Sequence, residues 1–283
     1  MKPKVIFSAN GTLTDFSVEM NDYFARTAAI PLAVTTDYLY IGSYFPFNHF
    51  YLKVNSANAV TSVLSAHYWD NTRTWRAVSL LTDETLSAGK TLAQNGYVSW
   101  NPDPQYSWSK EDTVDSAGTA LVTGLGNIKL YGFYWLRLKV SATVTSTTKL
   151  EWLGHRFSVD NDLGSEYPDL VTSATMTAFK SGKTDWEEQH IRVAELIVKD
   201  LKRIKALNSG SQILDWEDFK LASVSKLAEI IYSAFGSAHK EQKDEALVEY
   251  KKRFNGITAK IDENANAQVD EAEKNIKSVV LFR

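Results

Sequence analysis

The stretch YGFYWLRLKV, residues 131–140, decides how the first part of this chain folds. Two sets of side chains alternate along it: Tyr134, Leu136, Leu138 and Val140 in one set, and Trp135, Arg137 and Lys139 in the other. A period of two places successive side chains on opposite faces of a β-strand, and one apolar face is typical of a strand that borders a core. We therefore predict a half-buried strand over this stretch.

Similar short segments occur on either side of this strand. They are FYLKV (50–54), SVLSAHYW (62–69), TWRAVSLL (74–81), GYVSW (96–100) and KLEWLGHRF (149–157). Turn-rich stretches such as NPDPQ and SAGT separate the segments, and no long helical pattern intervenes. Many short strands at this spacing favour an antiparallel β-sandwich of the jelly-roll kind, which we assign to residues 1–160.

The chain changes character near residue 180. The density of charged residues roughly doubles beyond that point, and most of the aromatic residues lie before it. A capping box of Thr184 and Glu187 opens a helical pattern, and Gly236 is placed to end a second helix. The apolar positions of the last helical pattern, spaced by three and four residues, are Leu247, Tyr250, Phe254, Ile257 and Ile261.

These patterns predict an α+β chain whose C-terminal part, residues 184–283, is an α-helical bundle. The intervening segment, residues 161–183, is polar and is interrupted by glycine and proline. Such composition is typical of loops, so we predict a linker or extended arm there.

Length and composition restrict the class of protein. With 283 residues, 44% of them hydrophobic, the chain can bury at least one core. It has no cysteine, which excludes disulfides and thiolate chemistry, and its net charge of -3 does not suggest a nucleic-acid-binding protein. The N-terminus lacks the apolar region of a signal peptide, and no stretch is long enough to span a bilayer. We expect a soluble protein that is made inside a cell.

The sequence does not indicate an enzyme. No nucleophile motif is present, and the histidines, which we interpret as surface or strand residues, lack the spacing of metal ligands. They are His49, His67, His155, His190 and His239.

One segment, DENANAQVDEAE at 262–273, follows the ligand spacing of an EF-hand calcium loop. Its oxygen-bearing ligand positions hold Asp262, Asn264, Asn266, Gln268 through its backbone carbonyl, Asp270 and Glu273. The sixth position, where glycine permits a sharp turn, holds Ala267, whose Cβ disfavours a positive φ. Two interpretations stay open, a Ca²⁺ site and a polar turn whose side chains cap their own backbone. No other cofactor is expected.

Four tryptophans flank turns of the predicted sandwich: Trp69, Trp75, Trp100 and Trp108. Exposed indole faces at these positions could stack on sugar rings, as glycan-binding modules do. Buried indoles would instead fill the sandwich core or an intersubunit surface, and we favour this second interpretation.

The C-terminal third resembles the head-to-tail connector (adaptor) proteins of tailed bacteriophages. The resemblance rests on the helical order, on the segment ILDWEDFKLASVSKLAEIIYSAF, and on the ending ITAKIDENANAQVDEAEKNIKSVVLFR, with its acidic turn, short apolar segment and final arginine. It covers roughly 100 residues and rests on pattern more than on any invariant motif, while the predicted sandwich is an added domain.

This resemblance implies a structural protein of the virion neck, assembled in the host cytoplasm. It implies docking on the portal protein, contact with tail or nozzle proteins, a ring of about twelve copies, and DNA passing through the channel without specific binding. The predicted docking residues are Val279, Val280, Leu281, Phe282 and Arg283. The alternative is a carbohydrate-binding or adhesion module that its helical domain attaches to a larger assembly.

Overall fold

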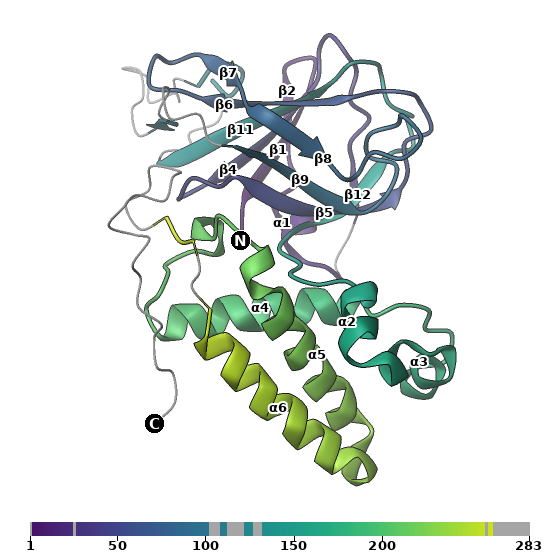
Figure 1. The fold of residues 1–283 in the computed structure, drawn as a ribbon. Helices are drawn as coiled ribbons and strands as arrows, with labels where there is room; N and C mark the ends of the chain where they lie inside the picture. The colour runs from purple at the N-terminus through teal and green to yellow at the C-terminus, as the bar shows by residue number, and fades with distance from the viewer. Residues whose placement is uncertain are drawn as a thin grey trace. The chain divides into compact units, whose positions relative to one another are not determined.

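The computed structural model of the chain describes residues 2–24, 27–101, 108–111, 122–126, 132–257 and 260–262. Its fold is α+β, with two antiparallel sheets and with helices mostly in the C-terminal part (Figure 1). The chain divides into two compact units between Gly154 and His155, close to the predicted end of the β-domain at residue 160. We call the part before this boundary the sheet unit and the part after it the helical unit.

The larger sheet of the sheet unit has seven strands, and all pairings between them are antiparallel. In spatial order they are β2 (Thr12–Asp15), β1 (Lys4–Ala9), β4 (Tyr38–Ser43), β11 (Phe133–Val140), β6 (Leu64–Trp69) and β7 (Trp75–Ala77), and β10 (Lys110–Glu111) also pairs with β11. The short helix α1 (Ser17–Asn21) follows β2.

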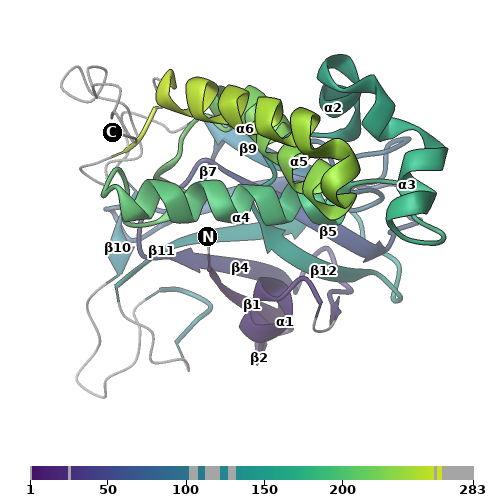
Figure 2. The same cartoon turned by 90° about the horizontal axis from the view of Figure 1, so that it is seen from below.

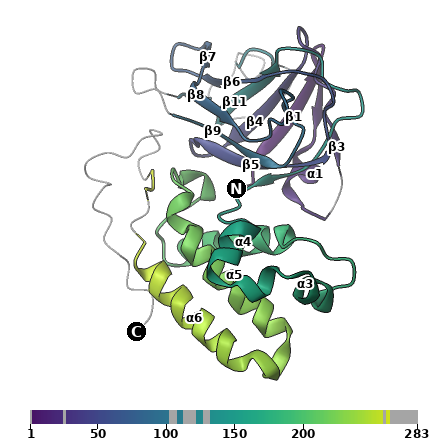
Figure 3. The same cartoon turned by 45° about the vertical axis from the view of Figure 1, so that its right-hand side comes forward.

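The smaller sheet has five strands, again paired antiparallel. In spatial order they are β3 (Ala28–Ala29), β12 (Lys149–Gly154), β5 (His49–Ser56), β9 (Gly96–Asn101) and β8 (Ser79–Asp83). Figure 3 labels β3, β5, β9 and β8. Apolar side chains from both sheets meet in one buried cluster, which includes Leu39 and Leu138 from the larger sheet and Leu52 and Val98 from the smaller.

Strand β11 confirms the alternation that the sequence predicts. Leu136, Leu138 and Val140 are buried in the cluster shared by the two sheets, whereas Arg137 and Lys139 are half-buried. Trp135 has no exposed surface either, because it belongs to a second cluster on the opposite face of the same strand. The central strand of the larger sheet therefore has apolar packing on both of its faces.

The helical unit begins at His155 and has a buried core of its own. Its α-helices are α2 (Asp160–Glu166), α3 (Ser173–Phe179), α4 (Glu187–Arg203), α5 (Lys220–Ala234) and α6 (Lys240–Asn255). Four 3-10 helices connect them: η1 (Pro168–Val171), η2 (Gly210–Gln212), η3 (Glu217–Phe219) and η4 (Gly236–His239). Helix α5 packs against both α4 and α6 (Figure 2).

The segment 161–183 differs from the predicted linker, because it folds as α2, η1 and α3. Leu163, Leu170 and Met176 point into the core of the helical unit and are almost fully buried. Burying these three apolar side chains stabilises helices that are too short to be stable alone. Runs of four to seven residues cannot display a helical repeat, so glycine and proline dominate the sequence pattern.

The helix ends show two further differences. Helix α4 begins at Glu187 with Trp186 as its N-cap, and no side-chain cap is made, so the predicted capping box of Thr184 is wrong. The C-cap of α5 is Phe235, and Gly236 follows it with a φ of +78°, so the glycine takes the left-handed position just beyond the end of the helix.

Candidate functional site

Two of the four tryptophans proposed for sugar stacking are buried. Trp69 is 1% exposed and Trp100 is 4% exposed, each within an apolar cluster of the sheet unit. A sugar ring needs an open indole face, so the stacking prediction is wrong for both. They fill the interior, as the favoured interpretation expected.

Trp75 and Trp108 are half-buried, and the backbone holds both indole N–H groups. The Nε1 of Trp75 donates to the carbonyl oxygen of Thr123 at 2.9 Å, and the Nε1 of Trp108 donates to that of Trp135 at 3.0 Å. The ring of Trp108 packs against the shared cluster, 4.9 Å from the ring of Phe47. Trp108 is therefore part of the packing of the sheet unit, and the ring of Trp75 lies against the guanidinium of Arg137.

The predicted ion loop and docking tail fall largely outside the described residues. Of the ligand positions only Asp262 is described, and Asn264, Asn266, Gln268, Asp270 and Glu273 lie outside that part of the chain, as do the docking residues 279–283. Within the described ranges, no group of three His, Cys, Asp or Glu side chains is arranged to hold a metal ion.

Asp262 is fully buried, and its peptide group is fixed to the end of η2. Its N–H donates to the carbonyl oxygen of Gln212 at 2.9 Å, and its own carbonyl oxygen accepts from the Nε2 of Gln212 at 2.8 Å. Ile261 bridges to Ile213, and the N–H of Leu214 donates to Lys260. We call this pairing of residues 212–214 with residues 260–262 the exit clamp.

The side chain of Gln212 organises the exit clamp from both ends. Its Oε1 accepts from the backbone N–H groups of Asn208, at 2.8 Å, and Ser209, at 2.9 Å, while its Nε2 holds Asp262. Gln212 is 2% exposed, so these hydrogen bonds lie in a medium where an unpaired polar group is costly. The chain therefore passes residue 262 from a fixed point in the helical unit.

A chain of hydrogen bonds between serine, histidine and aspartate lies in the same unit. The Oγ of Ser158 is 2.7 Å from the Nδ1 of His190 and 2.8 Å from the Oγ of Ser223. The Nε2 of His190 is 3.1 Å from the Oδ1 of Asp160, and both carboxylate oxygens of Asp160 accept the N–H of Trp186 at 3.2 Å. We call Ser158, Asp160, His190 and Ser223 the buried polar chain.

The connectivity of the buried polar chain is that of a hydrolytic triad, but its accessibility is not. Ser158 is 3% exposed, His190 1% and Ser223 0%. Burial lowers the pKa of His190, against the opposing effect of its hydrogen bond to Asp160, so the imidazole is neutral at pH 7. A neutral imidazole can accept from Ser158 and donate to Asp160. The buried polar chain thus joins the start of the helical unit to α4 and α5, and neither of its serines is exposed as a nucleophile.

Sequence patterns did not predict the buried polar chain. Its four members come from three segments, and His190 was interpreted as a surface or strand residue. The structure corrects that interpretation, since His190 lies on the buried face of α4. An apolar helix stripe interrupted by one histidine was the available signal, but its partners are 32 and 30 residues away.

The sheet unit carries a cluster of cationic and aromatic side chains on β11 and its neighbours. The guanidinium carbon of Arg137 lies 4.5 Å from the ring centroid of Tyr38 and 4.7 Å from that of Trp75. In the sheet register Arg137 faces His67 on β6, and Lys139 is the next residue on the same face of β11. We call Tyr38, His67, Trp75, Arg137 and Lys139 the cation–aromatic patch.

All five side chains of the cation–aromatic patch are half-buried. Burial, together with the positive charges of Arg137 and Lys139, lowers the pKa of His67 to about 4. His67 is therefore neutral at pH 7, and the local charge comes from the arginine and the lysine. The groups that shift the pKa of His67 are burial and two cations, with no acidic side chain among them, so the electrostatic potential at the ring is positive.

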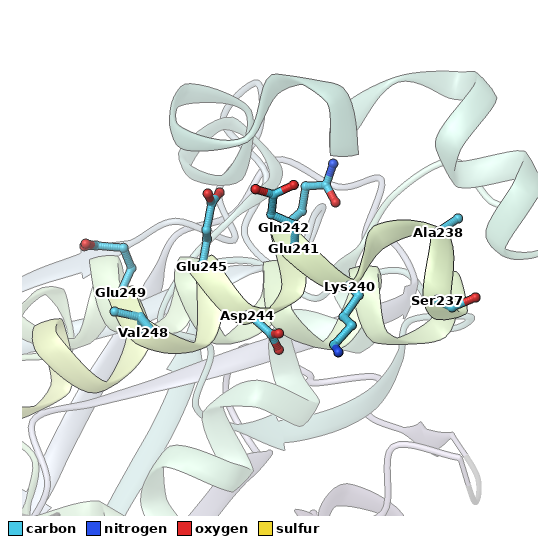
Figure 4. A pocket seen from close by; sticks show the side chains of 9 residues that line it. All are labelled: Ser237, Ala238, Lys240, Glu241, Gln242, Asp244, Glu245, Val248 and Glu249. Atoms are coloured by element: carbon cyan, nitrogen blue, oxygen red, sulfur yellow. The ribbon is translucent and has the colours of Figure 1, made fainter.

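The start of α6 carries an open depression of about 960 Å³, in which four of the nine lining residues are acidic (Figure 4). Glu241, Glu245 and Glu249 project on one side of the helix, and Asp244 and Val248 project on another. Val248 is 63% exposed. An acidic row on a single exposed helix face is the ordinary solvated side of an amphipathic helix, and it defines no ligand by itself.

Compared with known protein families, with curated proteins and with solved structures, the chain matches none of them. Among the helices of the described ranges, none combines the length and the apolar character that crossing a membrane requires.

Proposed function

We propose that this chain is a structural protein of the neck of a tailed phage, an adaptor that joins the portal to the tail. In this proposal the sheet unit is a β-sandwich of the jelly-roll kind and the helical unit is a small bundle. About twelve copies form a ring around the channel through which DNA passes. The net charge of -3 is compatible with passage of DNA without adhesion.

Two separate cores support the adaptor proposal. One buried cluster is built from the two sheets, and another is built only from residues 157–261. A protein that holds two partners needs surfaces that do not depend on one another, and units with separate cores provide them. The helical unit would carry the portal contact, and the sheet unit would face other neck or tail proteins.

The exit clamp is the observation that carries the proposal. Because the clamp fixes the chain at Asp262, the segment that follows starts from a defined point of a folded unit. Val279 lies 17 residues further on, a separation of at most about 60 Å when extended. A docking segment tethered in this way reaches a groove on an adjacent protein at high effective concentration. The apolar residues Val279–Phe282 and the charge of Arg283 would make that contact.

The first experiment is immunogold labelling of phage particles with antibody against this chain. We expect gold at the junction of head and tail. Label confined to the tail tip or the capsid faces, or particles without label while the lysate contains the chain, would contradict the neck assignment.

A second experiment tests the docking segment on assembled portal rings, by electron microscopy and co-sedimentation. The variant carries Val279→Ser, Val280→Ser, Leu281→Ser and Phe282→Ser. The matched control carries Glu271→Ser, Lys274→Ser, Asn275→Ser and Lys277→Ser in the same segment. We expect the first to lose the ring and the control to keep it, since only the first removes apolar contact area. Equal assembly by both would remove the docking role.

A further inference from the structure

The geometry of Arg137 is the starting point of an inference that is independent of the neck assignment. Its guanidinium lies between the rings of Tyr38 and Trp75, at 4.5 Å and 4.7 Å from their centroids. Strand β11 fixes its backbone between β4 and β6, in register with Tyr40 and His67. Stacking on two rings restricts the long side chain before any ligand arrives, which lowers the entropic cost of binding.

The charge of Arg137 is not neutralised within the described part of the chain. None of the ion pairs found there includes Arg137 or Lys139, and the Nε of Arg137 is buried without a hydrogen-bond acceptor. By contrast, Arg76 on the neighbouring strand β7 is paired with the carboxylate of Asp70 at 2.9 Å. Arg137 has no such carboxylate: its side chain hydrogen-bonds to the hydroxyl of Tyr40, whose pKa burial raises to about 12, so that this partner is neutral at pH 7 and leaves the positive charge uncompensated.

The neighbouring groups add to the same potential. Lys139 lies two residues along the same face, and the buried Nδ1 of His67 has no hydrogen-bond partner among the described residues. The pKa of His67 is lowered by burial and by both cations, which is the response expected of a site with positive potential. A planar guanidinium with a lysine beside it matches an oxyanion, because two of its N–H groups can bind two oxygens at once.

We propose that the cation–aromatic patch binds an oxyanion, namely the carboxylate, sulfate or phosphate group of an acidic saccharide or of a free small anion. Arg137 supplies the paired donors and Lys139 supplies a second charge. The half-buried rings of Tyr38 and Trp75 hold the guanidinium and flank the bound group. Neutral His67 accepts or donates one hydrogen bond to a hydroxyl next to the anion.

The test is calorimetric titration of the full chain at pH 7 and fixed ionic strength. The probes are sodium sulfate, sodium phosphate, polygalacturonate, dextran sulfate and neutral dextran. We expect sulfate or phosphate to bind weakly and the polyanions to bind more tightly, because several anions share one chain. Neutral dextran should not bind.

Variants decide whether the patch is responsible. We expect Arg137→Gln to weaken anion binding at least about tenfold, Arg137→Lys to weaken it less, and Lys139→Gln to weaken it about threefold. Arg73→Gln is the matched control, because it removes an exposed arginine of the same unit outside the patch. Near-ultraviolet circular dichroism checks folding, and Arg137→Lys keeps the test valid should Arg137→Gln unfold.

The binding results distinguish a free small anion from an acidic saccharide as the ligand, and a binding site from a packing role of Arg137. Binding of both inorganic anions and polyanions that depends on Arg137 supports a general oxyanion site. Arg137-dependent binding of the saccharide polyanions alone supports an acidic glycan as the ligand. Equal loss in Arg73→Gln and Arg137→Gln, or no binding by any probe, overturns the proposal and leaves the stacked arginine a packing element.

Discussion

The buried turn at Asp70 in the sheet unit and the core of the helical unit satisfy their polar groups over different distances along the chain. In the sheet unit the buried carboxylate of Asp70 accepts from Thr72, Thr74 and Arg76, all within six residues. In the helical unit Ser158 reaches Ser223 across 65 residues, and Gln212 reaches Asp262 across 50. The turn at Asp70 is therefore satisfied locally, unlike Asn58 of the same unit, which reaches Thr145 across 87 residues, while the core of the helical unit depends on its helices being in place.

This difference predicts how each unit responds to damage. A turn held by its own aspartate leaves several nearby donors without an acceptor when that carboxylate is lost. A long-range hydrogen bond exists only in the assembled core, so its loss affects the stability of the whole unit. The loss of unfolding free energy caused by removing an apolar core side chain is the reference with which the effects of these polar groups are compared.

Removing a core tryptophan of the sheet unit should have the largest effect. The ring of Trp135 has no exposed surface and fills the space beside Gly42, where an added Cβ would lie 2.8 Å from the ring. We expect Trp135→Ala to lower the free energy of unfolding of the sheet unit by about 3–5 kcal/mol. Urea unfolding measures this, with Trp135→Phe as the smaller change. A loss of unfolding free energy below about 1 kcal/mol would show that the second cluster, to which Trp135 belongs, contributes little to stability.

Asp70 tests the locally satisfied turn. Burial raises its pKa, but hydrogen bonds from Thr72, Thr74 and Arg76 outweigh burial and lower the pKa to about 2. Because the folded pKa is depressed, the stabilisation is complete above the usual range of a carboxyl group and is lost as pH falls towards 2. We expect Asp70→Ala to cost about 2–3 kcal/mol, since several donors lose their acceptor.

The measurement for Asp70 is urea unfolding at pH 7 and at successively lower pH. Asp37→Asn, at a second buried aspartate of the same unit, is the matched control for loss of a carboxylate. Wild-type protein and Asp70→Ala should converge in stability as the pH approaches 2. A constant difference down to that pH would mean that the charge of Asp70 contributes nothing.

Gln212 tests the long-range side of the comparison. Gln212→Ala removes the bonds to Asp262, Asn208 and Ser209, and we expect it to lower the stability of the helical unit by about 1–2 kcal/mol. Hydrogen exchange of residues 260–262 should rise with it. Gln242→Ala on the exposed side of α6 is the control. Unchanged exchange at residues 260–262 would show that the backbone pairing holds the exit clamp without the side chain.

His190 should give the smallest effect, visible as a pH dependence. Its pKa is lowered by burial, so the neutral form stabilises the fold fully above the unfolded pKa near 6.5. This stabilisation is lost as pH falls below that value, by at most about 1.4 kcal/mol per pH unit. The charged groups acting on the imidazole are Asp160, Arg156 and Asp162.

Hydrogen exchange of α4 and α5 between pH 7.5 and 5 follows His190 without interference from His67, which lies in the sheet unit. We expect His190→Gln to reduce the slope, and His239→Gln, the control on η4, to keep it. If both variants retain the wild-type slope, protonation of His190 is not coupled to the stability of the helical unit.

The strand and helix patterns with a long repeat were predicted in part: the last helical pattern, extended from sequence to Ile261, ends at Asn255, and the segment 74–81 is divided between β7 and β8 of different sheets. The alternation around Arg137 identified β11, and the spacing of Tyr250 and Phe254 identified the buried side of α6. Both signals reflect the burial of one face, which is repeated often enough along the element to be read. The helices between residues 161 and 183 were missed because each repeats less than twice.

The candidate sites were less accessible to prediction. A tryptophan in the sequence does not show whether its ring faces solvent or the core. For Trp69 and Trp100 the sequence therefore left two interpretations, an exposed stacking ring and a buried core ring. The buried polar chain and the exit clamp depend on residues brought together by packing, and no short-range pattern marks Ser158 or Gln212. The cation–aromatic patch also depends on the sheet register. Arg137 on β11 and Trp75 on β7 come together because both strands pair with β6.

The strand order has a consequence for how the chain folds as it is made. Strand β11 lies between β4 and β6, so Leu136 pairs with Ile41 on one side and with Tyr68 on the other. Strands β4 and β6 therefore leave the ribosome before the strand that joins them, and loop closure over such separations slows folding. The helical unit, with α5 and α6 adjacent in sequence and in space, makes more local contacts. Although it is synthesised last, we expect it to reach its structure in less time after its release than the sheet unit.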